Sequence, residues 1–526
     1  GYASYNSFMI APLPVVDETD PMPFPRTTSP SAHSGSERFF AAIDLGSNSF
    51  HLLVAAVSHG ELRPLAIRSE KVQLAAGLDN GWLDAAAIAR GLEALSRFRQ
   101  VLDTLNPGMV RVIGTNTLRA AKNAGDFIDP AQKMLGWPVE IVAGREEARL
   151  IYLGVAHSEA DDDAARLVVD IGGGSTELII GERFEARVLE SLHMGCVGYQ
   201  RRFFADGAIT RARCDQAYRA AYVELLNIRE EFRAQGWRDC VGSSGTYLAI
   251  AEILRAQGRG AITRSGLYAL RDQLIQCGHV DKLGGIAGLK AARHGVIAAG
   301  TAIACAIMDA LEIDAMRASS GALREGAIYD LVGRLQHEDV RERTVSALLR
   351  RSGVPEFHAR RVERVADGLF VQVAADLGLA DPHREVLRWA ARLHEIGLAV
   401  SHSQFHKHGQ YIIEHADLPG FAREEQRILA ALVRGHRRKF PRTLIESFPT
   451  EDVGVLTHLC VLLRLAVVFK YASPLDGVPV LRFSAAPGIY RLRFPDGWLE
   501  RHPLTAAELS QECDYLAQAN LALRLE

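Results

Sequence analysis

The sequence lacks several features that would define its class at once. No uncharged apolar run reaches the roughly 20 residues that a bilayer span needs, and the longest run, 295–308, predicts a buried helix. Its seven cysteines include no CxxC pair, which argues against a zinc ribbon or a disulfide framework and favours a reducing compartment. No basic segment followed by an apolar one opens the chain, so we expect no secretory signal. We therefore expect a soluble cytoplasmic protein.

A large excess of charge is also absent. The 60 Lys and Arg residues nearly balance the 63 Asp and Glu residues, for a net charge of −3. A global basic surface for nucleic acid is therefore excluded, and any site for a polyanion must be local. A length of 526 residues with 48% hydrophobic residues allows a large core divided among about three or four domains.

The first 37 residues differ in composition from the rest of the chain. Six prolines lie among Ser and Thr residues between positions 12 and 30. Such a segment buries too little apolar area to offset the entropy of ordering it. We predict that 1–37 is a disordered tail.

From residue 38 to about 335, short apolar runs alternate with amphipathic segments, which predicts an α/β architecture. The strand-like runs are 41–44, 110–114, 139–142 and 167–170, and the helix-like segments are 84–102, 146–155 and 211–235.

After residue 335 the pattern changes to amphipathic helices alone, followed by a short hairpin pattern and one more helix. The predicted helices are 341–351, 358–377, 384–397, 424–434, 452–471 and 506–517, and the hairpin strands are 478–483 and 488–494. We predict a mostly helical domain and a small α+β domain at the C-terminal end.

One sequence pattern occurs twice. Asp44-Leu-Gly-Ser-Asn-Ser49 is repeated as Asp170-Ile-Gly-Gly-Gly-Ser175, and each copy lies between two apolar strands. Glycine allows backbone N–H groups to approach phosphate oxygens, hydroxyls add donors, and an Asp at a strand end suits Mg²⁺. One such loop alone is equally typical of a plain hairpin turn. Two loops with the same order predict a duplicated domain whose halves clamp adjacent phosphates.

These loops resemble the two phosphate motifs of the actin/hexokinase/Hsp70 superfamily, and more specifically those of the exopolyphosphatase/guanosine pentaphosphate phosphohydrolase (Ppx/GppA) family. The resemblance covers about 38–526. Further motifs match in the same order: 114–119 (GTNTLR), 144–150 (GREEARL), 194–197 (MGCV), 242–246 (GSSGT), 321–326 (GALREG), 393–397 (LHEIG) and 417–421 (DLPGF).

The resemblance implies the fold and the domain boundaries. We expect two actin-like (ribonuclease H-like) α/β domains at 38–151 and 152–335. A mostly helical HD-like domain follows at 336–475, and a small α+β domain at 476–526 closes the chain.

The resemblance also implies that Glu147 is the general base. From the residues alone, an acidic pair at a helix start is explained by the helix dipole, and Glu146 is the competing choice. Hydrolysis of a phosphoanhydride needs a carboxylate that orients and deprotonates a water in line with the leaving oxygen.

Three further acids, Asp44, Asp170 and Glu177, are implied to hold Mg²⁺ or another divalent cation. For Asp44 the competing interpretation is a carboxylate that accepts bonds from its own turn. For Glu177 it is a solvated strand residue. A divalent ion would neutralise the charge that develops on the leaving group.

The resemblance implies a set of phosphate-binding residues from four segments. They are Ser47, Asn48, Ser49, Arg119, Gly172, Gly173, Gly174, Ser175, Thr176, Ser244, Gly245 and Thr246. For Arg119 the competing interpretation is a surface arginine, and for 244–246 it is a plain turn. One departure from the family stands at Ser320, where exopolyphosphatases often carry Asp.

The helical domain contains part of a known metal-binding motif, but one ligand of that motif is missing. His394-Glu395 occupies the place of the His-Asp pair of HD phosphohydrolases, but Val467 stands where the late Asp is needed. We predict a degenerate metal site in which His394 is a core residue.

The same domain contains two basic runs. A charge run is usually a solvated face, yet polyphosphate is negatively charged at every unit and needs a basic track that raises its capture rate. The predicted track is His402, Arg434, His436, Arg437, Arg438 and Lys439. Glu224 departs from the basic character of the family at its position.

Together these features predict an exopolyphosphatase that releases orthophosphate from the end of inorganic polyphosphate with Mg²⁺. The alternative within the family is a pppGpp 5′-phosphohydrolase that makes ppGpp. An ATP-driven actin-like or Hsp70-like binding protein is the alternative of another class. The resemblance further suggests a homodimer, in the cytoplasm or peripheral to the membrane, with no nucleic-acid partner.

Overall fold

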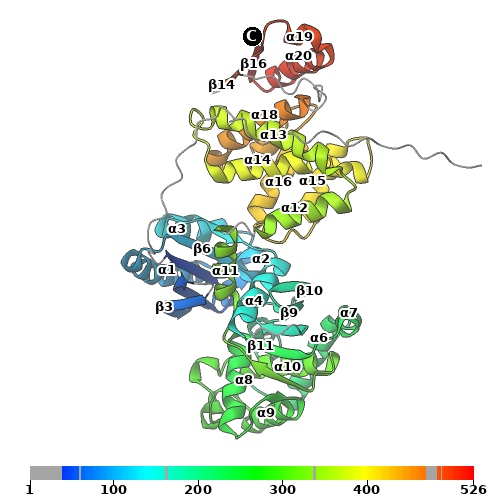
Figure 1. Cartoon of the computed structure of the whole chain (residues 1–526). Helices are drawn as coiled ribbons and strands as arrows, with labels where there is room; N and C mark the ends of the chain where they lie inside the picture. The colour runs from blue at the N-terminus through cyan, green and yellow to red at the C-terminus, as the bar shows by residue number, and fades with distance from the viewer. Residues whose placement is uncertain (1–37, 59–60, 160–163, 336–338, 470–481, 487) are drawn as a thin grey trace, which may run out of the picture. The chain divides into compact units, whose positions relative to one another are not determined.

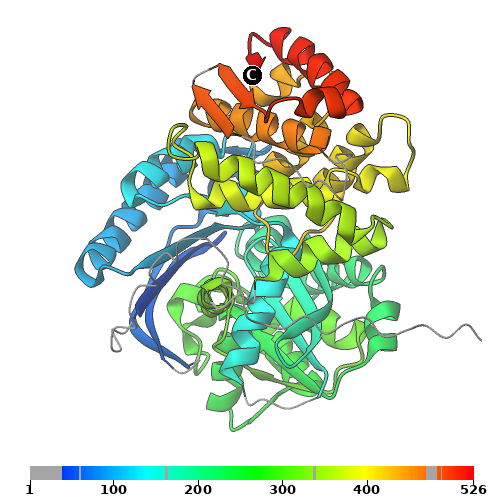
Figure 2. The same ribbon diagram turned by 45° about the horizontal axis from the view of Figure 1, so that its top comes forward.

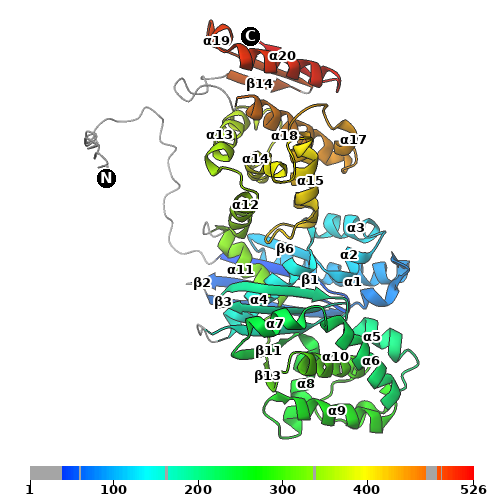
Figure 3. The same cartoon turned by 90° about the vertical axis from the view of Figure 1, so that its right-hand side faces the viewer.

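The computed structural model describes residues 38–58, 61–159, 164–335, 339–469, 482–486 and 488–526. The predicted tail, 1–37, lies outside the described residues, as do residues 478–481 of the first predicted hairpin strand. Figures 1–3 show the arrangement of the described elements from three directions.

The first α/β domain is built on a five-stranded sheet with the order β3-β2-β1-β6-β7. The first three strands pair antiparallel, and β1, β6 and β7 pair parallel. The strands are β1 (Arg38–Leu45), β2 (Ser49–Ser58), β3 (Glu61–Lys71), β6 (Met109–Gly114) and β7 (Val139–Ile141). The short strands β4 (Leu78–Asp79) and β5 (Trp82–Leu83) form a separate ribbon.

The second domain repeats this topology, with the order β10-β9-β8-β11-β13 and one further strand, β12, at the edge. Its strands are β8 (Arg166–Ile171), β9 (Thr176–Glu182), β10 (Glu185–Leu192), β11 (Asp239–Ser243), β12 (Ile262–Thr263) and β13 (Ala315–Ala318). Asp44 pairs with His51 across β1 and β2, and Asp170 pairs with Glu177 across β8 and β9. The predicted duplication is therefore confirmed down to the register of the strands.

Two helices, α4 (Gly144–Ser158) and α11 (Leu323–Leu335), pack between the two sheets (Figure 1). They approach each other so closely that a Cβ on Gly326 would lie 1.8 Å from the Leu150 carbonyl oxygen. Side chains alternate along a strand, so Phe40 and Ala42 face these helices, while Ala41 and Ile43 face the opposite side. The predicted boundary between 151 and 152 falls inside α4.

Other helices cover the outer faces of the two sheets. Against the first sheet lie α1 (Ala85–Leu105) and α3 (Gly125–Leu135), with the short α2 (Asn116–Ala120) after β6. Around the second sheet are α5 (Cys196–Phe203), α6 (Arg211–Leu225), α7 (Arg229–Gln235), α8 (Ser244–Ala256), α9 (Arg264–Cys277) and α10 (Ile297–Ala310). The predicted helix 211–235 is wrong as a single element, because residues 226–228 interrupt it and divide it into α6 and α7.

The third region is helical, as predicted. It contains α12 (Val340–Arg351), α13 (Glu356–Val373), α14 (Asp381–Leu393), α15 (Phe405–His415), α16 (Arg423–Gly435), α17 (Arg442–Ile445) and α18 (Thr450–Val468). Their buried faces form one hydrophobic core, which includes Trp389, Leu432 and Leu462.

The C-terminal elements share that core instead of building a separate one. Phe483, Tyr490, Leu509 and Leu523 belong to the same buried cluster as the helices. The elements are β14 (Arg482–Ala486), β15 (Ile489–Arg493), α19 (Trp498–Arg501), α20 (Pro503–Ala517) and β16 (Ala522–Leu525). β16 was not predicted, and it pairs parallel to β15.

No helix among the described residues is both long and apolar enough to cross a membrane. The apolar run 295–308 corresponds to α10, which is buried along almost its whole length.

Candidate active site

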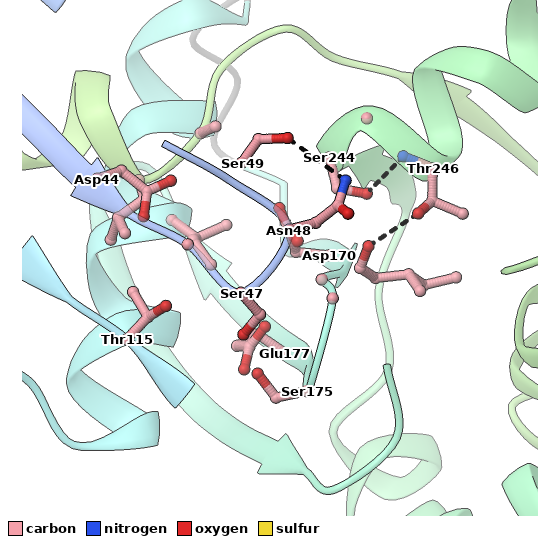
Figure 4. Close-up of a pocket in the computed structure, with 18 of the residues that line it drawn as sticks. Asp44, Ser47, Asn48, Ser49, Thr115, Asp170, Ser175, Glu177, Ser244 and Thr246 are labelled. Carbon is pink, nitrogen blue, oxygen red and sulfur yellow. Dashed lines mark hydrogen bonds between the residues drawn. The ribbon is translucent and has the colours of Figure 1, made fainter. Parts of the chain in front are cut away.

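The two glycine-containing loops meet beside one cavity, which both of them line. A Cβ built on Gly173 would lie 2.9 Å from the Ser47 Cβ, and one on Gly174 would lie 2.4 Å from Asn116 Oδ1. Only glycine allows so close an approach of the second loop to the first. The β1–β2 and β8–β9 turns therefore form one continuous polar wall (Figure 4).

The cavity has a volume of about 260 Å³ and brings most of the predicted site residues together. The predicted residues that line it are Asp44, Ser47, Asn48, Ser49, Glu147, Asp170, Gly172, Gly173, Gly174, Ser175, Glu177, Ser244, Gly245 and Thr246. The loop 244–246 is the first turn of α8, whose N-terminal N–H groups favour an anion nearby.

Strand alternation explains why the acids meet here. Asp44 shares a strand face with Ala42, and Asp170 shares one with Val168, so both carboxylates lie on the sheet faces toward α4. Glu177 follows the same rule with Ile179. The duplication thus places equivalent side chains opposite each other, one from each sheet.

The helix α4 carries Glu147 into the cavity from its first turn. Arg119 Nη1 donates to Glu147 Oε2 at 3.1 Å and to the Val142 carbonyl at 2.7 Å. Arg119 therefore contacts the acid but is not itself among the residues that line the cavity. Glu146 does not line the cavity either; it accepts hydrogen bonds from Arg149 at 2.8 Å and from the Gly420 N–H at 2.9 Å.

Burial governs the protonation of these acids. It raises the pKa of Asp44 to about 8, and the charge of Glu147 adds to this rise. It also raises the pKa of Asp170 to about 7, although a hydrogen bond from Ser243 lowers this pKa in part. The pKa of Glu177 lies well above its ordinary value because of burial and the nearby charges of Glu147 and Asp170. Burial also raises the pKa of Glu147, although Arg119 opposes this rise.

The arrangement fits a divalent cation that takes only part of its ligands from the protein. Asp44 Oδ1 is buried and accepts no hydrogen bond from the described residues. Yet the described part of the chain contains no group of three or more His, Cys, Asp or Glu side chains placed to hold a metal ion. Mg²⁺ characteristically binds through one or two carboxylates and completes its shell with water and phosphate oxygens, and the acids here suit that mode.

The prediction that the Thr176 hydroxyl binds phosphate is wrong. Thr176 is fully buried, and its hydroxyl donates to the Met194 carbonyl. Its neighbour Glu177 faces the cavity, and consecutive strand residues face opposite sides. Thr176 therefore points into the core of the second domain.

Several cavity residues were not assigned a role from the sequence. They are His51, Thr115, Asn116, Arg293 and Arg324. Thr115, Asn116 and Arg324 lie within matched motifs, so their position offered a signal. Arg293 lies outside every motif, and its guanidinium sits so close to Gly245 that a Cβ there would be 1.7 Å from Nη2. His51 is kept neutral, because burial and the charges of Arg324 and Arg293 lower its pKa to about 3.

Five of the predicted track residues line a second cavity, of about 500 Å³, in the helical region. The residues around it are His402, Ser403, Gln404, His406, Lys407, Arg434, Arg437, Arg438 and Lys439, and none of these lining residues is acidic. Arg437 also lies over the Phe405 ring at 4.6 Å. The structure therefore gathers the basic run around one hollow.

The prediction that His436 contributes to this basic surface is wrong. Its side chain is only 2% exposed, and Nδ1 lies 2.6 Å from the Val433 carbonyl. Burial and neighbouring histidines hold its pKa well below the ordinary value, so it is neutral. His394 packs against it with ring centroids 5.3 Å apart and is also buried, as predicted for a core residue.

Comparison with known proteins agrees with this geometry. The model of the Ppx/GppA phosphatase family matches residues 53–335, and the model of Ppx/GppA phosphatase domain III matches residues 340–513. The two similar α/β domains with paired glycine-containing loops and the helical third region agree with these matches. The chain belongs to the Ppx/GppA phosphatase family and is a hydrolase.

Two solved structures are similar to this chain at 24% and 25% sequence identity. An exopolyphosphatase from Cytophaga hutchinsonii is 25% identical with a TM-score of 0.52, over 56% of this chain and 97% of that one. A Ppx/GppA family member from Aquifex aeolicus is 24% identical with a TM-score of 0.50, over 57% of this chain and 99% of that one. The second similarity is evidence for the fold alone.

Proposed function

We propose that the protein hydrolyses the terminal phosphoanhydride of inorganic polyphosphate and releases orthophosphate. The observation that carries the proposal is the position of Glu147, which faces the cavity formed by the two glycine-containing loops. The loops offer backbone and hydroxyl donors to a phosphate, and the carboxylate offers a base to a water beside it. No other acid on α4 lines the cavity.

In this proposal the residues of the chain divide the work. Ser47, Ser49 and Ser175 donate to the terminal phosphate, and the Gly172–Gly174 backbone approaches it closely. Glu147 orients a water in line with the leaving oxygen and accepts its proton. Arg119 holds the Glu147 carboxylate in place through the 3.1 Å bond.

We further propose that Mg²⁺ binds at Asp44, Asp170 and Glu177, of which one or two ligate it directly while water and phosphate oxygens complete its shell. The bound ion would neutralise charge on the phosphate oxygens. The raised pKa values of these acids support this assignment, because a bound cation would favour the ionised forms that burial disfavours.

The basic hollow supports polyphosphate as the substrate. Arg434, Arg437, Arg438 and Lys439 line it together, and no acidic side chain is among its lining residues, as a site for a long polyanion requires. A pppGpp 5′-phosphohydrolase is the second candidate, because Arg293 and Arg324 add two cations to the catalytic cavity itself, where a nucleoside polyphosphate would place its inner phosphates.

The experiment that tests the proposal is phosphate release, with Mg²⁺, from long-chain polyphosphate and from pppGpp, using the wild type and Glu147→Gln. Glu93→Gln serves as the control, because Glu93 is an exposed glutamate on α1. We expect release from polyphosphate, and we expect Glu147→Gln to slow it by about two to four orders of magnitude while binding remains. Release mainly from pppGpp would assign the second candidate.

No release from either substrate would contradict the proposal. In that case an ATP-driven binding protein, the alternative of another class, would be favoured. A rise of the unfolding temperature with ATP alone would then be expected, because a ligand stabilises the folded state that binds it.

A further inference from the structure

A loop of the helical region contacts the first turn of the helix that carries Glu147. This loop, 417–421, lies between α15 and α16. The Gly420 N–H donates to Glu146 Oε2 at 2.9 Å, and Arg145 Nη1 donates to Asp417 Oδ2 at 2.9 Å. The two residues that precede Glu147 are therefore both bound by one loop.

Contacts with other residues of the helical region restrain the conformation of the loop 417–421. Gly420 has a φ of 88°, and a Cβ there would lie 2.8 Å from Arg341 Cγ. The Thr344 hydroxyl donates to the Pro419 carbonyl at 2.8 Å, and Phe421 packs against Trp389 with centroids 5.0 Å apart. The helical region thus presents the loop to α4 in one conformation.

The contact continues into a buried network of charges. Glu146 pairs with Arg149, which pairs with Asp330 on α11, and Asp330 pairs with Arg111 on β6. Glu146, Asp330 and Arg111 are at most 5% exposed. A buried charge that loses its partner is costly, so the orientation of Glu146 is tightly fixed.

The start of α4 has no other side-chain cap. The side chain of its N-cap residue, Ala143, cannot accept a hydrogen bond from the first turn. The loop from the helical region and the Glu146 network therefore supply the restraint that a capping side chain usually gives. Glu147 follows directly in the same turn, so its direction depends on this restraint.

We propose that Glu146, Asp417 and Gly420 are positioning residues that hold the first turn of α4 and so aim the Glu147 carboxylate into the cavity. This inference rests on the proposed function, in which Glu147 is the base. In this inference the helical region helps to orient the proposed base, in addition to its proposed role in binding the substrate.

The test compares Gly420→Ala and Asp417→Asn with the wild type, with Asp417→Glu as the conservative rescue. Glu424→Gln is the matched control, because Glu424 is an exposed carboxylate of the same helical region that pairs with Arg427. The measurements are kcat and KM for phosphate release, and hydrogen exchange of residues 144–150.

We expect kcat to fall about tenfold in Gly420→Ala, since a misplaced base can cost that much or more. We expect a smaller fall, of about threefold, in Asp417→Asn, because the pair that it breaks is exposed to solvent. KM should stay within about twofold of the wild type, because no substrate contact is lost. Asp417→Glu should restore kcat, and Glu424→Gln should leave it unchanged. Should Gly420→Ala not fold, the Asp417 series decides alone.

Unchanged kcat in the folded variants, or a rise in KM alone, would overturn the inference. The exchange measurement separates its failure from that of the proposed function. If the wild type released no phosphate, faster exchange at 144–150 in Gly420→Ala, but not in Glu424→Gln, would still support the restraint. Equal exchange in both variants would overturn it.

Discussion

Arg119 and Glu147 form an ion pair at the edge of the cavity between the two α/β domains, with Nη1 and Oε2 3.1 Å apart. Arg119 comes from α2 in the first domain, and Glu147 comes from the helix between the two sheets. Burial raises the pKa of Glu147, and the guanidinium opposes this rise. The pair therefore keeps a buried acid closer to the ionised form that a base needs.

Removing Arg119 should shift the pH dependence of the reaction. In Arg119→Gln the opposing charge is lost, so the pKa of Glu147 should rise further. The acid limb of kcat against pH should then move to higher pH, and kcat at pH 7 should fall by about tenfold or more. Arg119→Lys should move the limb less, since it keeps the charge but not the two contacts. An acid limb that does not move in Arg119→Gln would show that Glu147 is not the titrating base.

Cation binding should depend on pH through Asp44 and Asp170. Their pKa values, about 8 and about 7, exceed those of the unfolded chain. Between about pH 4 and pH 8 the folded state therefore binds more protons than the unfolded state, and without cation its stability falls as pH rises through this window. Mg²⁺ should compensate by replacing the protons.

Thermal unfolding in EDTA and in Mg²⁺ at pH 6 and pH 8.5 measures this effect. We expect the increase in unfolding temperature caused by Mg²⁺ to be larger at pH 8.5. Asp44→Asn should be more stable than the wild type in EDTA at pH 8.5 and should lose most of the Mg²⁺ effect. A Mg²⁺ effect of equal size in Asp44→Asn would exclude Asp44 as a ligand.

The basic hollow should matter for long substrates. Arg437→Gln combined with Arg438→Gln removes two charges from its lining. We expect KM for long-chain polyphosphate to rise about tenfold and the activity on tripolyphosphate to change by less than about twofold. The matched control is Arg360→Gln with Arg427→Gln, two exposed arginines of the same region. An equal loss on both substrates would contradict a track.

The features that the sequence predicted well depend on local patterns. The glycine-containing loops and their flanking strands are contiguous segments, so their duplication was visible as a repeat and reappears in the strand register. Asp44 and Asp170 share the strand parity of the residues facing α4, which is also a local property. The same rule could have excluded Thr176, which alternates with Glu177.

The features that escaped prediction depend on contacts between distant segments. Arg293 reaches the cavity from a short 3-10 turn that belongs to no motif. The burial of His436 follows from the packing of α14 and α15 against the end of α16. Its basic neighbours in the sequence instead favoured an exposed histidine in the basic track. The link between Gly420 and Glu146 joins residues 274 positions apart. Pattern and spacing carry no information on such pairs.

The buried histidines should make the protein sensitive to acid. Burial lowers the pKa of His406 to about 4, and that of His436 lies well below 6.5, the value of a histidine in the unfolded chain. As pH falls below 6.5, the unfolded state binds protons that the folded state does not, so stability is lost.

In His436→Asn this source of instability is removed, while the amide can still donate to the Val433 carbonyl. We expect the variant to lose less stability than the wild type between pH 7 and pH 5 in urea unfolding, at a cost of about 1–2 kcal/mol at pH 7 from poorer packing. His415→Asn is the control, because His415 makes a similar contact with the Tyr411 carbonyl but is exposed. Equal pH dependence in His436→Asn and the wild type would show that His436 can be protonated within the folded protein.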